Sequence, residues 1–323
     1  MMKNFDYVKA GSLAEAIKAV SVKGAWLHAG GTDLLGCARD EVMPVDKVVS
    51  VSGLKELKGI TARADGGLRI GALTTLAEIA ADGSVSGKFA VLSQAAAAVG
   101  TPQIREQGTI GGNLCQRPRC WYFRGDFQCL KKGGKTCYAM AGENQYHAIF
   151  GGGPCFFVHP SDVAPALAAL EAQVKIAGPS GSRTVSIDNF FVSPARVLDR
   201  ENILGPGEIV TDIQIPPVRG ELKSSYRKIA ARGSWDFAIV SVAAALQMEG
   251  ATVRGGRLVL GGVAPHPWRL PEVEKLLAGR KLDGALAAEA ASAAASGARA
   301  LRDNKYKVTM VQGAVEEVLA AFL

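Results

Sequence analysis

The amino-acid sequence predicts an α+β protein made of two or three sub-domains. The chain has 323 residues, which corresponds to about two domains at ~150 residues per domain. Its first fifty residues alternate strand-like and helix-like patterns, and two later segments have the glycine-containing turns of β-hairpins. An apolar run before Pro216-Pro217 predicts a strand followed by a linker, so we expect a boundary near residues 217–223.

Each expected element follows from a local pattern. Ser12 is a typical N-cap for a helix over 13–20, which lies between strands expected at 4–10, 25–29 and 47–51. The middle of the chain predicts a hairpin over 59–72, helices over 75–81, 89–99 and 160–170, a second hairpin over 172–187 and a strand over 209–215. The remainder predicts one sheet with strands at 226–231, 239–248, 252–254 and 258–263, followed by helices over 272–276, 286–295 and 311–322.

Composition excludes several classes of protein. Apolar residues make up 48% and charged residues 21%, which is typical of globular proteins rather than disordered ones. The net charge of +7 and the 7% of aromatic residues do not indicate a nucleic-acid partner. No run of ~18 apolar residues predicts a membrane span, and the first residues lack the pattern of an export signal. We therefore expect a cytoplasmic protein, or a periplasmic one exported together with a partner.

Five of the six cysteines fall within 41 residues, spaced C-x4-C-x8-C-x7-C-x17-C from Cys115 to Cys155. In a reducing compartment, clustered cysteines indicate a metal or cluster site more than disulfides. Between Cys115 and Cys137 lie six basic residues and one acid, and nearby cations stabilise thiolates. The spacing by itself does not choose between zinc, an iron–sulfur cluster and free thiols.

Two glycine-rich turns are candidates for binding a phosphate. The first covers residues 27–34 and the second covers residues 108–113. Glycines let backbone N–H groups approach an anion closely, so two such loops could grip a diphosphate from both sides. Neither loop matches G-x-G-x-x-G or a P-loop, and a single loop of this kind is more simply a turn.

Taken together and in order, these motifs resemble the FAD-binding medium subunit of molybdenum hydroxylases, the xanthine dehydrogenase family. The resemblance rests on Ala29-Gly30-Gly31-Thr32-Asp33-Leu34-Leu35, Gly71-Ala72-Leu73-Thr74-Thr75-Leu76, Gly108-Thr109-Ile110-Gly111-Gly112-Asn113-Leu114, Ser161-Asp162, Glu208-Ile209-Val210, and Tyr226-Arg227-Lys228 with Arg232, Asp236 and Val240. It implies a vanillyl-alcohol-oxidase-like (PCMH-type) FAD-binding domain in two parts, followed by an α+β domain like that of carbon monoxide dehydrogenase flavoproteins. We expect the FAD-binding domain over 1–219, with sub-domains 1–55 and 56–219, and the C-terminal domain over 220–323.

The resemblance implies a set of FAD-contacting residues. The first loop is expected at the pyrophosphate and toward the isoalloxazine, the second loop opposite it, and Asp162 near the adenosine half. Val210 and Lys228 match positions that approach the flavin from later strands. The implied residues are Leu27, His28, Ala29, Gly30, Gly31, Thr32, Asp33, Leu34, Thr109, Gly112, Asn113, Asp162, Val210 and Lys228.

Residues 115–158 form an insertion that most members of the family lack. A subset carries a [4Fe–4S] cluster there, and the surrounding residues look closer to the bacterial aldehyde oxidoreductases than to 4-hydroxybenzoyl-CoA reductase. This resemblance implies Cys120, Cys129, Cys137 and Cys155 as ligands. Cys115 is then a spare thiol that could lie near the flavin, and Cys37 is expected to be a buried apolar residue.

The resemblance implies an electron-transfer subunit of a heterotrimeric enzyme that oxidises aldehydes to carboxylic acids. A small subunit would carry two [2Fe–2S] clusters, a large subunit would carry molybdopterin, and an external acceptor would take electrons at FAD. No residue of this chain is expected to be catalytic toward the organic substrate. Two alternatives remain open: a 4-hydroxybenzoyl-CoA reductase-like β subunit, and a zinc-stabilised, non-enzymatic binding protein.

Overall fold

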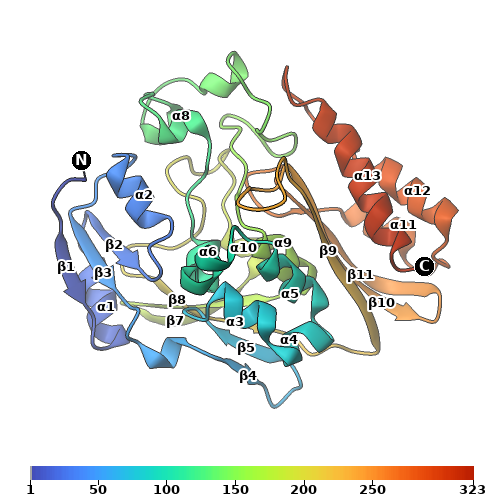
Figure 1. Ribbon diagram of the computed structural model, residues 1–323, viewed down its shortest axis with the longest axis horizontal. Helices are drawn as coiled ribbons and strands as arrows, with labels where there is room; N and C mark the ends of the chain where they lie inside the picture. Colours follow the sequence, from blue (N-terminus) through green and yellow to red (C-terminus); the bar gives the residue numbers. More distant parts are fainter. Residues whose placement is uncertain (1) are drawn as a thin grey trace.

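The computed structural model describes residues 2–323 and contains three β-sheets with helices packed around them (Figure 1). The N-terminal sheet, the central sheet and the C-terminal sheet follow one another across the molecule. The segment 115–158, drawn in green, lies above the central part of the fold in Figure 1. The mixture of helices and strands confirms the predicted α+β class.

The N-terminal sheet has three parallel strands in the order β1-β3-β2. Its elements are β1 (Asp6–Lys9), α1 (Leu13–Val20), β2 (Ala25–His28), α2 (Leu34–Arg39) and β3 (Lys47–Ser50). The Ser12 hydroxyl accepts a hydrogen bond from the backbone N–H of Glu15, which confirms the predicted N-cap of α1. Because β2 ends at His28, the glycines of the first loop follow directly after the carboxyl end of this strand.

The central sheet has five strands in the order β4-β5-β8-β6-β7, and all neighbours are antiparallel. Its strands are β4 (Ile60–Ala62), β5 (Leu68–Gly71), β6 (Gln173–Gly178), β7 (Gly181–Ser186) and β8 (Ile209–Ile215). Both predicted hairpins are confirmed. Its helices are η1 (Lys55–Leu57), α3 (Leu76–Ala81), α4 (Gly83–Lys88), α5 (Ala90–Ala97), α6 (Pro102–Gln107), α7 (Ile110–Leu114), α9 (Val163–Ala169) and α10 (Ile187–Phe190).

The short helices α4, α6 and α7 were not expected from the sequence, although each has a recognisable cap. Thr101 caps α6, which has Pro102 in its first turn, and Thr109 caps α7. The insertion contains only α8 (Trp121–Arg124) and the 3₁₀ turns η2 (Leu130–Lys132) and η3 (Tyr138–Met140). With so little regular structure, its position depends on side-chain contacts.

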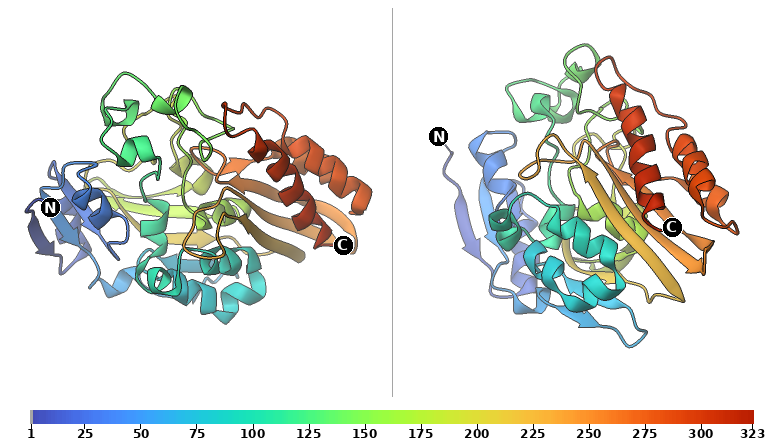
Figure 2. Two further views of the ribbon diagram at one scale, coloured as in Figure 1. Left: turned by 45° about the horizontal axis from the view of Figure 1, so that its top comes forward. Right: turned by 45° about the vertical axis from the view of Figure 1, so that its right-hand side comes forward.

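The C-terminal sheet has four antiparallel strands in the order β12-β11-β10-β9, and α11, α12 and α13 cover one of its faces (Figure 2). Its elements are β9 (Glu221–Ile229), β10 (Val240–Glu249), β11 (Thr252–Gly261), β12 (Trp268–Arg269), α11 (Pro271–Leu277), α12 (Gly284–Ala294) and α13 (Tyr306–Ala320). The expectation of two strands at 252–254 and 258–263 was wrong. The chain stays paired through Gly256, where a Cβ would overlap the carbonyl oxygen of Ala245.

Alternate residues of β10 enter two different cores. Val242 and Ala244 face α11–α13, whereas Ala243 and Ala245 pack with helices α5 and α9 of the preceding part of the chain. The C-terminal sheet is therefore buried on both faces, and its inner face belongs to the same core as the central sheet. The segment between β8 and β9 holds Pro216-Pro217, as expected of a linker.

Candidate functional site

A cavity of about 680 Å³ lies where the first and second glycine loops meet. Twelve of the fourteen residues that the resemblance implies line this cavity, and His28 and Lys228 do not. The twelve are Leu27, Ala29, Gly30, Gly31, Thr32, Asp33, Leu34, Thr109, Gly112, Asn113, Asp162 and Val210. The fold therefore brings residues as far apart in sequence as Leu27 and Val210 into one concave surface, and its size suits an organic cofactor.

The first loop presents unused backbone donors. Among residues 2–323, the N–H groups of Gly30, Gly31 and Thr32 donate to no group of the chain. Gly31 has φ of 72°, a conformation that favours glycine, and a Cβ at Gly30 would overlap the carbonyl oxygen of Gln107. The glycines thus let the first loop touch the segment that leads into the second loop.

The second loop is fixed by hydrogen bonds of its own side chains. The Thr109 hydroxyl accepts from the N–H of Gly112 at 3.1 Å, and the Asn113 carbonyl oxygen Oδ1 accepts from the Ser161 hydroxyl at 2.5 Å. Thr109 also forms an isolated β-bridge with Thr75. These contacts fix Gly112 and Asn113 at the cavity wall and leave the Asn113 amide nitrogen as a donor.

Asp162 lies at the cavity with a buried carboxylate. Tyr226 donates its hydroxyl to Asp162 Oδ1 at 2.7 Å, and Lys228 Nζ donates to Oδ2 at 2.8 Å. We call these three residues the Asp162 cluster. Burial raises the pKa of Asp162 above its ordinary value, while Lys228 and Tyr226 oppose that rise. Burial, with Asp162 adding to it, raises the pKa of Tyr226 well above its ordinary value.

Lys228 does not line the cavity, but it binds Asp162 and Asp236, which do. Besides Asp162, its ammonium group donates to the carbonyl oxygens of Ala98 at 3.0 Å and Asp236 at 2.8 Å. All three donors of the ammonium are therefore engaged within the chain. His28 lies behind the first loop, because a Cβ at Gly31 would be 2.7 Å from its Nε2 atom. Burial lowers the pKa of His28.

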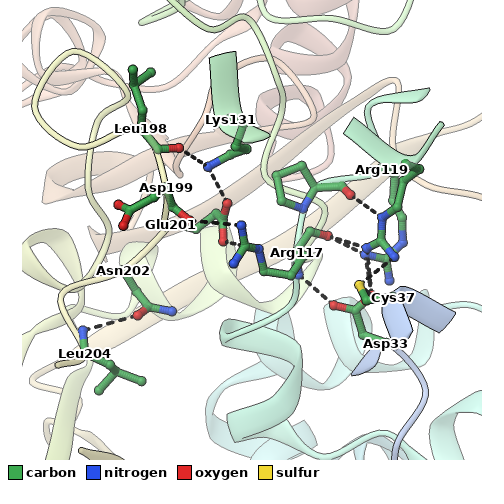
Figure 3. A network of polar contacts seen from close by, with 12 residues as sticks. Asp33, Cys37, Arg117, Arg119, Lys131, Leu198, Asp199, Glu201, Asn202 and Leu204 are labelled. Carbon is green, nitrogen blue, oxygen red and sulfur yellow. Dashed lines mark hydrogen bonds and ion pairs between the residues drawn. The ribbon is translucent and has the colours of Figure 1, made fainter. Parts of the chain in front are cut away.

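Asp33 is bound by the insertion rather than left free at the cavity. Its carboxylate accepts from the Arg117 backbone N–H at 2.7 Å, and its Oδ1 pairs with Arg119 at 2.9 Å (Figure 3). Arg124 pairs with the same oxygen at 2.8 Å and donates to the Sγ atom of Cys37 at 2.9 Å. We call Asp33, Arg117, Arg119 and Arg124 the Asp33 cluster. It joins the first glycine loop to the segment that carries the cysteines.

A second acid, Glu201, pairs with two of the basic residues between Cys115 and Cys137. Glu201 is buried, and it pairs with Arg117 at 3.0 Å and with Lys131 at 2.5 Å (Figure 3). Lys131 also donates to the Leu198 carbonyl oxygen at 2.8 Å. The sequence led us to expect these cations around thiolates. In the structure, these cations instead form ion pairs with the carboxylates of Asp33 and Glu201, which lie 70 or more residues away in sequence. The paired cations are Arg117, Arg119, Arg124 and Lys131.

The four implied cysteine ligands lie near one another. The neighbouring Cys155 thiol lowers the pKa of Cys137, and the same neighbour together with burial raises the pKa of Cys155. Burial raises the pKa of Cys120 to about 11, and Cys129 and Cys137 add to this rise. Cys120 Sγ lies 3.3 Å from His147 Nε2. In residues 2–323, no three Cys, His, Asp or Glu side chains are arranged to hold a single metal ion.

The two other cysteines occupy different surroundings. Cys115 lines the cavity, and burial raises the pKa of its thiol to about 12. Cys37 is fully buried beside Val42 and Phe123, which confirms the expected burial. All six thiols are free within the described chain.

Sequence reasoning missed part of the cavity wall. Trp235 and Phe237, from the connection between β9 and β10, line the cavity together with Gly100 and Ile104. Arg119 lies over the Phe237 ring at 5.0 Å. Two aromatic residues in the connection between these strands were the available signal, and it is weak because single exposed apolar residues are common on protein surfaces.

An α+β fold with a cavity between two glycine loops is typical of a protein that binds a phosphate-containing organic cofactor. Residues 3–218 match the family described as the FAD binding domain in molybdopterin dehydrogenase, and residues 225–322 match the CO dehydrogenase flavoprotein C-terminal domain. The chain belongs to the family of FAD-binding medium subunits of molybdenum hydroxylases, and it is a flavoprotein subunit of a molybdenum-dependent oxidoreductase.

Individual relatives agree with this assignment. The chain is 40% identical over 281 residues to the aldehyde oxidoreductase FAD-binding subunit PaoB of Escherichia coli, covering 85% of this chain and 86% of that protein. It is 30% identical to the glyceraldehyde dehydrogenase medium chain of Sulfolobus acidocaldarius, covering 90% and 87%. The carbon monoxide dehydrogenase structure from Hydrogenophaga pseudoflava shares its fold, with a TM-score of 0.79, 24% identity, and coverage of 99% and 98%. No helix in residues 2–323 is long and apolar enough to cross a membrane.

Proposed function

We propose that the cavity binds FAD through the residues that the resemblance implies. The observation that carries this proposal is the unused N–H groups of Gly30, Gly31 and Thr32, which lie beside the second loop. Backbone N–H groups of this kind favour a diphosphate. The Asn113 amide lines the same cavity. FAD, when bound, would supply the redox chemistry, while the chain would bind and orient it and exclude water from it.

The structure suggests different tasks for three of the proposed residues. The Asp33 carboxylate is occupied by arginines, so we propose that it holds the first loop in place instead of contacting the cofactor. Lys228 likewise acts through Asp162 and the carbonyl of Asp236. His28 supports the first loop from behind. The remaining residues are proposed to contact FAD directly.

We further propose that Cys120, Cys129, Cys137 and Cys155 hold a [4Fe–4S] cluster. Four thiols that lie near one another are the donor set that such clusters use. Cys129 and Cys137 raise the pKa of Cys120, and Cys137 and Cys155 shift the pKa of each other, which supports this grouping. A cubane cluster would lie between the thiolates, so it does not require them to converge on one ion. The Asp33 cluster would then fix the distance between this segment and the FAD loop.

The function that follows is electron transfer in a heterotrimer that oxidises aldehydes. A small subunit with [2Fe–2S] clusters and a large subunit with molybdopterin would deliver electrons to FAD, and an external acceptor would remove them. The 40% identity to an aldehyde oxidoreductase subunit supports this substrate class. We also propose the division into domains 1–219 and 220–323, and a location in the cytoplasm or, with an exported partner, in the periplasm.

The absorbance spectrum of the purified complex tests the cofactor content. We expect visible flavin bands on a broad iron–sulfur shoulder. A colourless protein that contains zinc would overturn the proposal and favour a zinc-stabilised binding protein. Assaying aldehydes, purines and aromatic thioesters with the same preparation would separate aldehyde oxidation from the reductase alternative.

Variants of the two loops test the FAD site. Asn113→Ala together with Gly31→Val is expected to lower FAD occupancy several-fold, because one donor is lost and a side chain enters the first loop at a φ that disfavours it. Gly59→Val is the matched control. Gly59 has φ of 88°, open space around it and no part in the cavity. Equal FAD occupancy in both variants would contradict the loop assignment.

Variants of the cysteines test the metal site separately. Cys129→Ser is expected to lower the iron content of the purified complex, whereas Cys115→Ser is expected to keep it. Both are single thiol-to-hydroxyl changes in the same segment, so each is a control for the other. Iron loss in Cys115→Ser, or full iron in Cys129→Ser, would show that the ligand set is wrong.

A further inference from the structure

Arg117, in the insertion, forms polar contacts with two acidic residues that line the cavity. Its backbone N–H donates to the Asp33 carboxylate at 2.7 Å, and its Nε atom lies 3.0 Å from Glu201 Oε2 (Figure 3). Its Nη2 atom also donates to the Asp199 carbonyl oxygen at 3.0 Å. Asp33 belongs to the first loop, whereas Asp199 and Glu201 belong to the connection between α10 and β8. One residue of the insertion therefore joins two separate parts of the cavity wall.

The contacts to Glu201 are shielded from water. The side chain of Glu201 is 2% exposed and that of Arg117 is 13% exposed. The other carboxylate oxygen of Glu201 pairs with Lys131 at 2.5 Å, and Lys131 is itself buried, with its ammonium group 4.6 Å from the centre of the Phe157 ring. Displacing the insertion would leave the Glu201 carboxylate buried without a cation, which is costly. We therefore expect the insertion and this part of the cavity wall to move together.

The basic residues that make these contacts lie close to the cysteines in the sequence. Arg117 shortly precedes Cys120, and Lys131 closely follows Cys129. The insertion has one short helix and two 3₁₀ turns, so few backbone hydrogen bonds fix its path. A metal centre bound by cysteines from several parts of this segment would close loops in it and so order it. The positions of both basic residues then depend on whether the cysteines hold a metal centre.

We propose that Arg117 is a positioning residue that couples the occupancy of the cysteine site to the affinity of the cavity for FAD. The inference rests on the proposed FAD site and on the proposed cluster site. An ordered insertion would hold Asp33 and Glu201, and with them both parts of the cavity wall, in the arrangement that binds the cofactor. Coupling between two sites typically changes an affinity about 5–150-fold. FAD would then bind more tightly to a complex whose cysteines hold a metal centre.

A double-mutant cycle on the flavin-free complex tests the coupling. Cys137→Ser removes one proposed ligand, and it is preferred to Cys129→Ser because Cys129 packs in the same apolar cluster as Cys37. With Arg117 present, Cys137→Ser should weaken FAD binding at least about fivefold, and with Arg117→Met less than about twofold. A direct contact between Arg117 and FAD would instead lower the affinity by the same factor with and without the metal centre. An equal effect of Cys137→Ser in both backgrounds would overturn the proposal.

The variant and its control are chosen to keep the chain folded. In Arg117→Met, Glu201 keeps Lys131 as its partner, so no carboxylate is left buried alone. Lys132→Met is the matched control, because the Lys132 ammonium group donates to the Gly125 carbonyl oxygen inside the insertion and does not line the cavity. In this background the serine substitution should keep its full effect on FAD binding. Loss of that effect in Lys132→Met would overturn the assignment to Arg117.

Hydrogen exchange on the flavin-free complex is a second measurement, which needs no change in the cavity wall. The backbone N–H groups of Cys37 and Val192 donate to the carbonyl oxygens of Asp33 and Glu201, at 3.1 Å and 3.0 Å. Peptides with these two N–H groups are expected to exchange several-fold faster in Cys137→Ser than in the wild type. Unchanged exchange in either peptide would overturn the coupling even where FAD binding is observed. If the wild-type complex binds no FAD, or holds no metal at these cysteines, the proposed function fails first and the inference fails with it.

Discussion

The Asp162 cluster and the Asp33 cluster both border the cavity, yet they differ in burial and in what they join. Asp162 and Lys228 have side chains 4% and 11% exposed, and they connect the central part of the chain to the C-terminal sheet. Asp33 and Arg119 are 17% and 28% exposed, and they connect the first loop to the insertion. Buried ion pairs are costly to break from one side, whereas more exposed ones are screened by water. One cluster should therefore govern folding and the other the position of the insertion.

The strongest way to test this difference is Lys228→Met. It leaves the Asp162 carboxylate buried without a cation, so we expect the free energy of unfolding to fall by about 3–5 kcal/mol. Lys223→Met is the matched control, because Lys223 lies on the same strand and makes one hydrogen bond, to the Phe322 carbonyl oxygen. Denaturant unfolding measures both. Equal losses would show that the Asp162 cluster is not specially costly to break.

The pH dependence of the free energy of unfolding gives a second test, at the buried residue His159. Burial lowers the pKa of His159 to about 3, with His266, Arg119 and Lys131 adding to the effect. The unfolded chain binds a proton near pH 6.5. The contribution of His159 is therefore fully present above pH 6.5 and is lost as the pH falls toward 3, at about 1.4 kcal/mol per pH unit.

His159→Gln is expected to flatten this slope, which corresponds to about 2–3 kcal/mol between pH 6.5 and pH 4.5. His266→Gln removes a group that adds to the lowering of the His159 pKa, and it is expected to keep most of the slope because burial is the largest cause. The measurement is urea unfolding at several pH values. An unchanged slope in His159→Gln would mean that another group takes up the proton.

The smallest effect is expected for Asp33→Asn. The amide keeps the size of the side chain but removes the charge that pairs with Arg119 and Arg124, so we expect a loss of about 1–2 kcal/mol. Trypsin should cut the insertion faster, because its arginines are released. Asp40→Asn removes an exposed pair with Arg39 and should change neither quantity. If trypsin cuts both variants at the wild-type rate, the Asp33 cluster does not hold the insertion.

Much of the fold could be predicted from local patterns. The Ser12 cap, the two hairpins and the strand at 209–215 were found because turn residues and hydrophobic periodicity act over a few neighbours. The continuity of β11 through Gly255 and Gly256 was not predicted, because two consecutive glycines are typical of a break between strands. Only the paired strand β10 shows that a glycine is needed there, since its Ala245 carbonyl oxygen lies where a Cβ of residue 256 would be. The resemblance grouped the glycine loops with Asp162, and all of the residues implied there except His28 line one cavity; their contact with FAD stays a prediction.

The sequence by itself determined the family, the two loops and the grouping of cysteines, because each of the motifs involved consists of residues close together along the chain. Only the tertiary structure decided how charges are paired. Asp33 meets Arg117 and Arg124 across 84 and 91 residues, and Lys228 reaches Asp162 across 66. The same holds for Trp235, whose place at the cavity depends on a hydrogen bond to Gly100. Such contacts are set by the path of the folded backbone, which brings distant groups into a low-dielectric interior where each charge must find a partner.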